Sequence, residues 1–212
     1  MFNLAIIGLT CLISFLCFND SRRFYKLANI PELAEKNNEY IRLLTSGFVH
    51  ADIMHLFLNM FVLYSFGEIA EMIFRSEAMF GEIQGGFMYL VFYLSSIVVA
   101  NVPTFLKHRH QHGYVGVGAS GAVAAVIYAC ILFMPLGKIY IFMALPVPAW
   151  LFGILYLVYE SYAAKNMSDN IGHDVHFNGA VYGLLFVSAV QPDVLLNFLE
   201  EIKMALLSGN IF

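Results

Sequence analysis

The feature that most constrains this chain is a succession of apolar runs, each close to the length needed to cross a lipid bilayer. A spanning helix needs about 20 apolar residues, because the hydrocarbon core is about 30 Å thick. The runs predict six spans followed by an amphipathic tail. The spans are expected at about residues 1–18, 52–74, 85–102, 118–134, 139–162 and 173–190, and the tail at 194–207. We therefore expect one all-α membrane domain over residues 1–212, built as a six-helix bundle.

The composition agrees with a membrane protein. Hydrophobic residues make up 60% of the chain and charged residues 12%, which excludes a soluble domain of ordinary composition. The net charge of -4 and the lack of a basic cluster argue against a nucleic-acid partner. Cys11, Cys17 and Cys130 lie inside apolar runs, where cysteine acts as a small hydrophobic residue, and no zinc-type spacing occurs.

The segments between the spans also carry predictions. Residues 1–18 end without a small-residue cleavage site, so an uncleaved first helix is favoured over a signal peptide. Residues 19–50 are the most polar part of the chain and predict a long first loop on the membrane surface. Pro103 is expected to end the third span, and Pro146 and Pro148 to break the fifth.

One short stretch, residues 116–125, combines a single serine with glycine and alanine. Ser120 stands where the fourth helix is expected to begin, with glycines at 118 and 121 beside it. A serine there would lie near unpaired backbone N–H groups and the positive end of the helix dipole, which can stabilise an oxyanion. The alternative is a packing seam, because small residues also let membrane helices approach closely.

Histidines in two other spans could complete a site around this serine. His176, Gly179 and Gly183 share one helical stripe, and that stripe permits close contact with the small residues of the fourth span. His176 would then lie beside Ser120, and a serine within hydrogen-bond reach of an imidazole is an activated nucleophile. His55 and Asn59 are four residues apart on one helical face, with His50 just before them.

Two other uses of the histidines stay open. His55 and His176 could ligate a heme from different helices, although this leaves the serine stretch unexplained. His173 and His176 could share a metal ion at helical spacing, but no His-Glu-x-x-His sequence occurs and the helix directs Asp174 elsewhere. Both are weaker accounts than the serine site, which would need neither a metal nor a cofactor.

Taken in order, the motifs between about residues 40 and 185 resemble those of the bacterial rhomboids, serine proteases that cut within the membrane. No single motif is specific, but the ordered set is. The matching elements are Arg42 in the first loop, the His-x4-His-x3-Asn pattern of His50, His55 and Asn59, the Gly-x3-Glu pair of Gly67 and Glu71, the Gly-x-Ser-Gly sequence at 118–121, and His176 with Gly179 and Gly183.

The resemblance implies a site and a set of partners. Ser120 and His176 would form a catalytic dyad, with His55 and Asn59 in the oxyanion hole and Gly118 and His50 as support. The substrates would be transmembrane proteins in the lipid bilayer, and the location the bacterial inner (plasma) membrane. The alternative within the family is a non-catalytic relative that binds membrane proteins. The sequence predicts no oligomeric state.

This chain departs from the family pattern at one position of the site. Many members carry a tyrosine four residues after the serine, where it stacks on the catalytic histidine, and this chain has Ala124. The departure concerns how the imidazole of His176 is held. It does not change which histidine is expected to act.

Overall fold

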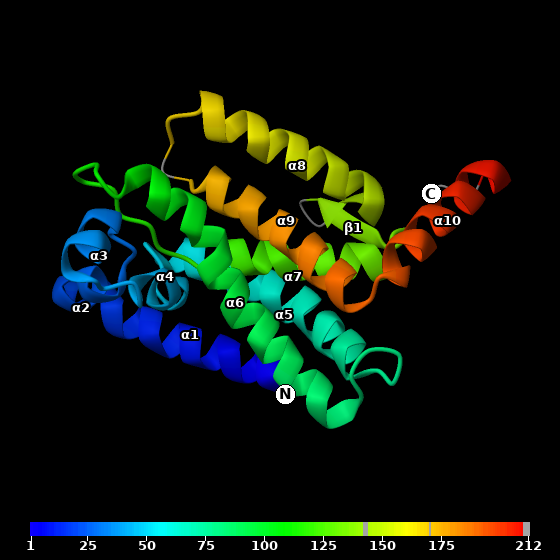
Figure 1. Cartoon of the computed structure of the whole chain (residues 1–212), viewed down its shortest axis with the longest axis horizontal. Helices are drawn as coiled ribbons and strands as arrows, with labels where there is room; N and C mark the ends of the chain where they lie inside the picture. The colour runs from blue at the N-terminus through cyan, green and yellow to red at the C-terminus, as the bar shows by residue number, and fades with distance from the viewer. Residues whose placement is uncertain (142–143, 170, 210–212) are drawn as a thin grey trace.

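The computed structural model describes residues 1–141, 144–169 and 171–209. In this part of the chain, helices from all along the sequence pack side by side as a bundle with short α7 at its centre (Figure 1). The bundle helices are α1 (Phe2–Phe18), α5 (Ile53–Arg75), α6 (Glu82–His108), α7 (Ser120–Phe133), α8 (Ala149–Asn166) and α9 (His173–Val190). The chain is predominantly helical, as the sequence predicts.

The central helix α7 is almost entirely enclosed by protein. It has 14 residues, so it is about 21 Å long and shorter than the hydrocarbon core of a bilayer. Helices α5, α6 and α9 surround it, and every residue from Gly121 to Val126 is buried. Because its neighbours cover it, α7 does not need to match the thickness of the lipid.

Among the described residues, α5 and α6 are each long and apolar enough to cross a membrane. Helix α9 and the following α10 (Asp193–Ser208) meet the same measure only as a pair, and they are bent by 110°. Helices α1 and α7 are shorter apolar helices. Length and composition therefore support a membrane helical bundle without confirming six spans.

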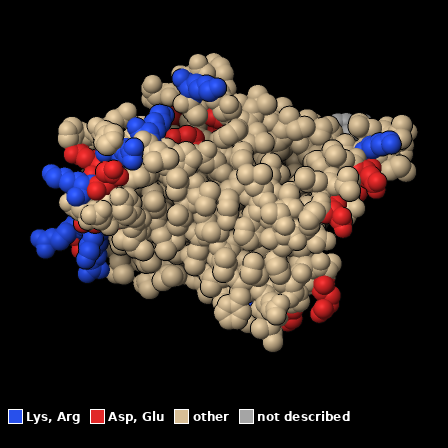
Figure 2. Space-filling model, viewed as in Figure 1, with Lys and Arg blue, Asp and Glu red and all other residues tan. Residues whose placement is uncertain are grey.

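The surface is divided in the way a membrane protein requires. Figure 2 shows charged side chains gathered mainly at the two ends of the molecule, with a broad uncharged band between them. Large apolar side chains point outward from this band, and on α5 they include Met54, Phe57, Phe61 and Tyr64. A contiguous apolar band of this kind marks a surface that lipid covers.

The first loop is a set of short helices, where the sequence analysis predicted only a long loop. These are α2 (Ser21–Leu27), α3 (Pro31–Asn37), α4 (Arg42–Thr45) and the 3-10 turn η1 (Ser46–Phe48). The buried Arg42 organises them, because its Nη1 donates to the carbonyls of Tyr25, Lys26 and Ala28 at 2.7, 2.9 and 3.1 Å. One guanidinium thus satisfies the carbonyls at the end of α2.

The prediction that Pro103 ends the third span is wrong. Helix α6 continues through Pro103 to His108. A proline removes one backbone hydrogen bond from a helix interior, and packing can offset that loss. Here the last turns of α6 pack against the first loop, where Phe105 forms a small apolar cluster with Ala34 and Leu43.

The predicted fifth span is wrong in its first part. Strands β1 (Lys138–Ile141) and β2 (Leu145–Pro148) form an antiparallel pair, and α8 begins only at Ala149. Pro146 and Pro148 each lack a backbone N–H group, and the loss of two helical hydrogen bonds within three residues disfavours a helix here more strongly than the single Pro103 does in α6. Pro148 is extended at φ -55° and ψ 137° and serves as the residue before the first turn of α8.

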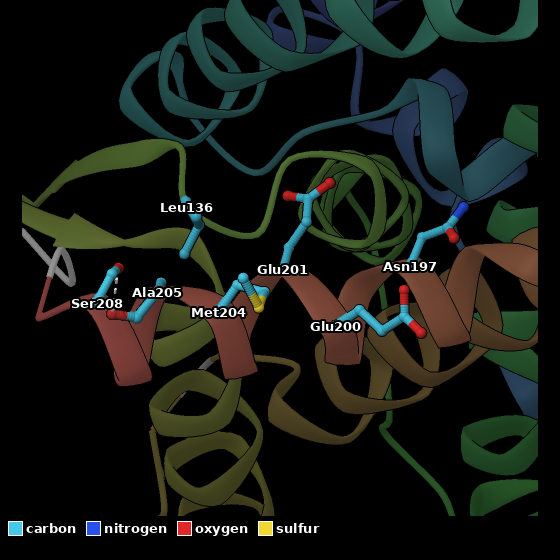
Figure 3. Close-up of a pocket in the computed structure, with 7 residues that line it drawn as sticks. All are labelled: Leu136, Asn197, Glu200, Glu201, Met204, Ala205 and Ser208. Carbon is cyan, nitrogen blue, oxygen red and sulfur yellow. Dashed lines mark hydrogen bonds between the residues drawn. The ribbon is translucent and has the colours of Figure 1, made fainter.

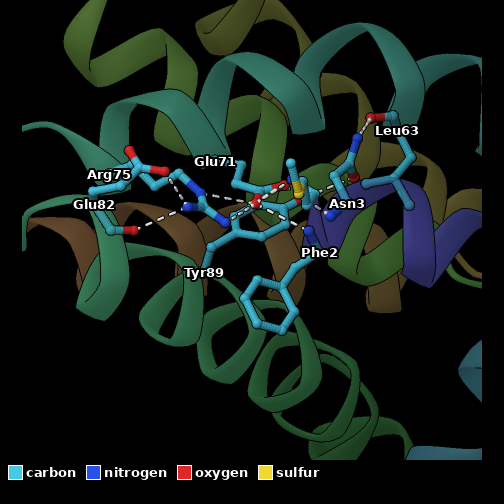
Figure 4. Close-up of polar contacts among 8 residues, drawn as sticks. Phe2, Asn3, Leu63, Glu71, Arg75, Glu82 and Tyr89 are labelled. Atoms are coloured by element: carbon cyan, nitrogen blue, oxygen red, sulfur yellow. Dashed lines mark hydrogen bonds and ion pairs between the residues drawn. The ribbon is translucent and has the colours of Figure 1, made fainter.

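Helix α1 is joined to α5 through Gly67 and Glu71, and Figure 4 shows the contacts of Glu71. The Glu71 carboxylate accepts the backbone N–H groups of Phe2 and Asn3 at 3.0 and 2.8 Å, and it pairs with Arg75 at 2.9 Å. These N–H groups have no partner within their own helix, so the carboxylate caps α1 and opposes its dipole. A Cβ on Gly67 would overlap the side chain of Asn3.

Candidate active site

Ser120 is the first residue of α7, as the sequence predicts for a serine at a helix N-terminus. Ala119 precedes it, and in the described part of the chain no side chain caps this helix. The first N–H groups of α7 therefore keep their hydrogen-bonding capacity and the positive end of the dipole. That arrangement suits the negative oxygen formed when a serine attacks a carbonyl.

The segment before Ser120 is irregular, yet its backbone is paired. Gly116 exchanges two hydrogen bonds of 2.9 Å with Asn29, and the Gly118 N–H donates to the Ser46 carbonyl at 2.9 Å. Non-helical backbone within a membrane protein is tolerated where protein satisfies it, which these contacts do. The first loop thus fixes the position of residues 116–120, which we call the serine turn.

Gly118 is required by its conformation and by its neighbour. Its φ is +120°, which residues with a side chain rarely adopt. A Cβ at this position would lie 2.7 Å from Cε1 of His55. The imidazole of His55 therefore lies directly against the turn that leads into Ser120.

His50 connects the serine turn to α1 and is itself fully buried. Its Nε2 accepts the Ala119 N–H at 3.3 Å, and its Nδ1 lies 3.0 Å from Ser14 Oγ. The Ser14 hydroxyl donates to the Phe48 carbonyl at 3.0 Å, so the proton between Ser14 and His50 must reside on Nδ1. The contacts thus define a neutral imidazole.

The electrostatics around His50 agree with a neutral ring. Burial first, and then the neighbouring His55, lower the pKa of His50 to about 3, although Asp52 acts in the opposite direction. His50 therefore holds the Ala119 amide in place without adding a charge beside the serine.

Asn59 lies one turn after His55 on α5 and is nearly buried, at 7% exposure. Its Nδ2 donates one hydrogen to the His55 carbonyl at 2.9 Å. A primary amide carries two such hydrogens, so the second can serve another acceptor. The expected pairing of His55 and Asn59 on one helical face is therefore present.

Helices α7 and α9 meet through glycine. Cβ atoms on Gly179 and Gly183 would overlap backbone atoms of Gly121 and Ala125, respectively. The predicted glycine stripe of α9 thus packs directly against α7 just after Ser120. His176 lies one turn before Gly179. Within the described residues, no hydrogen bond joins Ser120 to His176.

The Nδ1 atom of His176 faces a carboxylate. His176 Nδ1 lies 3.1 Å from Glu160 Oε1, and His173 Nδ1 lies 2.5 Å from Glu160 Oε2. His173 Nε2 also lies 3.3 Å from Asp169 Oδ2. Glu160 is 3% exposed and comes from α8, which lies beside α9 (Figure 1), so its carboxylate and the rings of His173 and His176 meet between these two helices.

Sequence reasoning missed Glu160, because it found no carboxylate beside the histidines other than Asp174. It placed Asp174 correctly, since Thr104 Oγ1 donates to that carboxylate at 2.9 Å. The signal for Glu160 was an acidic residue inside an apolar run, where an ionisable group is costly without a partner. Only the packing of α8 on α9 identifies the partners.

The Glu160 cluster also bears on metal binding. Ligand atoms of Glu160, His173 and His176 lie within 4.8 Å of one another, which is close enough to meet on one ion. Direct hydrogen bonds already join the carboxylate to both rings. The two histidines of the heme alternative have other neighbours here, since His55 lies against Gly118 and His176 against Glu160.

A hollow of about 620 Å³ lies beside α10 (Figure 3). Its lining contains Leu136, Asn197, Glu200, Glu201, Met204, Ala205 and Ser208. Leu136 follows the C-terminal end of α7, whereas Ser120 begins that helix, so the hollow and the serine belong to opposite ends of α7. It contains no histidine or cysteine and adds nothing to the chemistry around Ser120.

Comparison with known proteins connects these motifs to one family. The Rhomboid domain family matches residues 37–192. The chain is 30% identical over 152 residues to RHOMBOID-like protein 12, mitochondrial, of Arabidopsis thaliana, covering 68% of this chain and 45% of that protein. It is 26% identical over 178 residues to Rhomboid-like protein 11, chloroplastic, of the same plant, covering 77% of this chain and 58% of that protein. The chain thus spans about half the length of these relatives.

Proposed function

The chain belongs to the rhomboid family, and on that premise we propose that it is an intramembrane serine endopeptidase with Ser120 as nucleophile and His176 as general base. The observation that carries this proposal is the packing of α9 on α7. Glycine-to-backbone contact sets His176 and Ser120 near the same depth, at the N-terminal ends of two touching helices.

The reaction proceeds by covalent catalysis. His176 Nε2 takes the hydroxyl proton as Ser120 Oγ attacks the carbonyl carbon of a peptide bond. The tetrahedral intermediate collapses when the imidazolium returns the proton to the leaving amine, and an acyl-enzyme remains. Water then attacks the ester with His176 again as base, which releases the acid and restores the serine.

The oxyanion is held by donors at the start of α7 and on α5. The Ser120 N–H faces the developing charge with the helix dipole behind it. His55, against Gly118, and the second amide hydrogen of Asn59 complete the hole. His50 supports it by holding the Ala119 amide.

The substrates are transmembrane proteins that reach the site from the bilayer, and the proposed location is the bacterial inner (plasma) membrane. The names of the two plant relatives place those proteins in mitochondria and chloroplasts. The rival function within the family is binding of membrane proteins without cleavage. It would give no role to a serine at the N-terminus of α7 or to a histidine in the first turn of the helix packed on it.

Active-site labelling separates the two functions. Purified protein in liposomes is treated with a fluorophosphonate probe and, in parallel, with a model transmembrane substrate. We expect the wild type to be labelled and to cleave, and Ser120→Ala to do neither. His176→Ala should lose cleavage because acylation needs the base. A folded wild type without labelling or cleavage would favour the binding function, and turnover by Ser120→Ala would disprove the nucleophile.

A further inference from the structure

Glu160 is a buried acid on the apolar helix α8, and the serine–histidine mechanism does not use it. An ionisable group in such a place is costly unless it has a partner and a purpose. Its two carboxylate oxygens are divided between His173 and His176, at 2.5 and 3.1 Å. We infer that Glu160 is a positioning residue that fixes the tautomer and orientation of His176, with His173 as its counter-ion. The inference rests on the proposed function.

The contacts of His173 define the charges in this cluster. Its ring lies between the Glu160 carboxylate on Nδ1 and the Asp169 carboxylate on Nε2. A neutral imidazole could donate to only one of them, whereas an imidazolium donates to both. His173 therefore carries the positive charge that lets Glu160 stay ionised in the protein interior.

An ionised Glu160 then determines the state of His176. A carboxylate only accepts hydrogen bonds, so the Nδ1 facing Oε1 must carry the proton. In the neutral ring the unprotonated nitrogen is Nε2, which is the atom that must accept the Ser120 proton. An acid in this place does what the buried aspartate does for the histidine of a catalytic triad.

The alanine at position 124 explains why His176 would need Glu160 to hold its ring. Ala124 is buried and has no ring to lay against the imidazole of His176. The ring is held instead from the side of α8, by a hydrogen bond that fixes both its angle and its proton. Tyr156 lies one turn before Glu160 on α8. Helix α8 is also joined to α7, because Tyr128 of α7 donates a hydrogen bond to the Gly153 carbonyl of α8.

Turnover measurements test the inference with two variants, each of which replaces one glutamate carboxylate by an amide. Glu160→Gln should lower kcat by about 10- to 1000-fold and change KM little, because it alters the base and not substrate binding. Glu160→Asp should recover part of that loss. Glu200→Gln, a change of the same kind at an exposed position of α10, should equal the wild type. Wild-type kcat in Glu160→Gln, with Ser120→Ala inactive, would overturn the inference and leave the protease assignment intact.

The tautomer of His176 can be measured directly in the folded wild-type protein. Nitrogen-15 labelling of the histidines, with His176→Gln to assign the signal, should show His176 in the wild type protonated on Nδ1. Protonation on Nε2 would overturn the inference. A chelator should leave turnover unchanged. Loss of turnover that zinc restores would make Glu160 a metal ligand and would also overturn it. An inactive, unlabelled wild type would instead defeat the proposed function.

Discussion

Gly179 of α9 lies so close to Gly121 of α7 that a Cβ on Gly179 would overlap the Gly121 carbonyl oxygen. Gly121 also has the Cβ of Ala100 near it, at 2.7 Å from where its own Cβ would stand. Three helices therefore converge one residue after Ser120. The depth of His176 relative to the serine is set by this backbone contact and not by a flexible side chain.

Gly179→Ala should therefore damage both stability and activity. The added methyl meets backbone, so the helices must separate, and overpacking of this kind costs about 1–3 kcal/mol. A shift of about 1 Å at the dyad can lower turnover about 100-fold. Thermal unfolding in detergent and cleavage rates measure the two effects. Gly8→Ala is the matched control, because nothing lies within 4 Å of a Cβ there. Equal behaviour of the two variants would contradict the close contact.

His55→Ala and Asn59→Ala should each lower kcat by about 10- to 1000-fold, which is the loss expected for one oxyanion donor. Substrate binding should change little, since both donors act on charge that exists only during the reaction. Steady-state kinetics with a model substrate separate kcat from KM. A large rise in KM at constant kcat would identify these side chains as substrate contacts.

The lowered pKa of His50 predicts that the folded protein loses stability in mild acid. Its folded pKa is about 3 against an ordinary value of 6.5, so the unfolded chain binds a proton first as the pH falls. The stabilising contribution is complete above pH 6.5 and declines toward pH 3, at up to about 1.4 kcal/mol per pH unit. Unfolding temperatures in detergent between neutral and mildly acidic pH would show this decline.

The control for this prediction is His50→Gln, which keeps an acceptor for the Ala119 N–H but cannot titrate. Other histidines also titrate in this range, so the informative quantity is the difference between wild type and variant. As the pH falls, we expect the wild type to lose more stability than the variant, so the stability difference between them should shrink. Parallel curves would mean that His50 is solvated or already charged in the folded protein.

The sequence was sufficient where spacing along one helix carries the information. The glycine stripe beside His176 and the common face of His55 and Asn59 follow from helical periodicity, and the structure shows both. The position of Ser120 at the start of α7 follows from the glycines before it. Each of these features depends on residues within about two turns of one another.

Features that depend on packing between distant segments were not predictable in the same way. Pro103 is tolerated because Phe105 packs on Ala34 and Leu43 of the first loop, a contact that no local pattern shows. Glu160 was missed although it is an acid in an apolar run, because its two histidine partners are fixed only by the approach of α8 to α9. Propensity and periodicity cannot report such contacts.

The orientation in the membrane is the last prediction, and two arguments about it disagree. Of the 11 lysines and arginines, eight fall on the Ser120 side and three on the side of the termini. The three are Arg75, Lys138 and Lys203. The positive-inside rule would therefore place Ser120 toward the cytoplasm. The resemblance to bacterial rhomboids predicts the reverse, with the serine side facing the exterior.

The structure favours the second orientation by explaining part of the charge count. Arg42 is buried, Arg23 lies within 4 Å of Asp20, and Arg109 at the end of α6 lies within 4 Å of Glu35 in the first loop. These charges therefore belong to a folded, partly neutralised layer. We expect a cysteine at Gln111, in a chain without native cysteines, to react with a membrane-impermeant maleimide in intact cells. A cysteine at Ser208 should react only after lysis. The opposite pattern would place the Ser120 side in the cytoplasm and restore the charge rule.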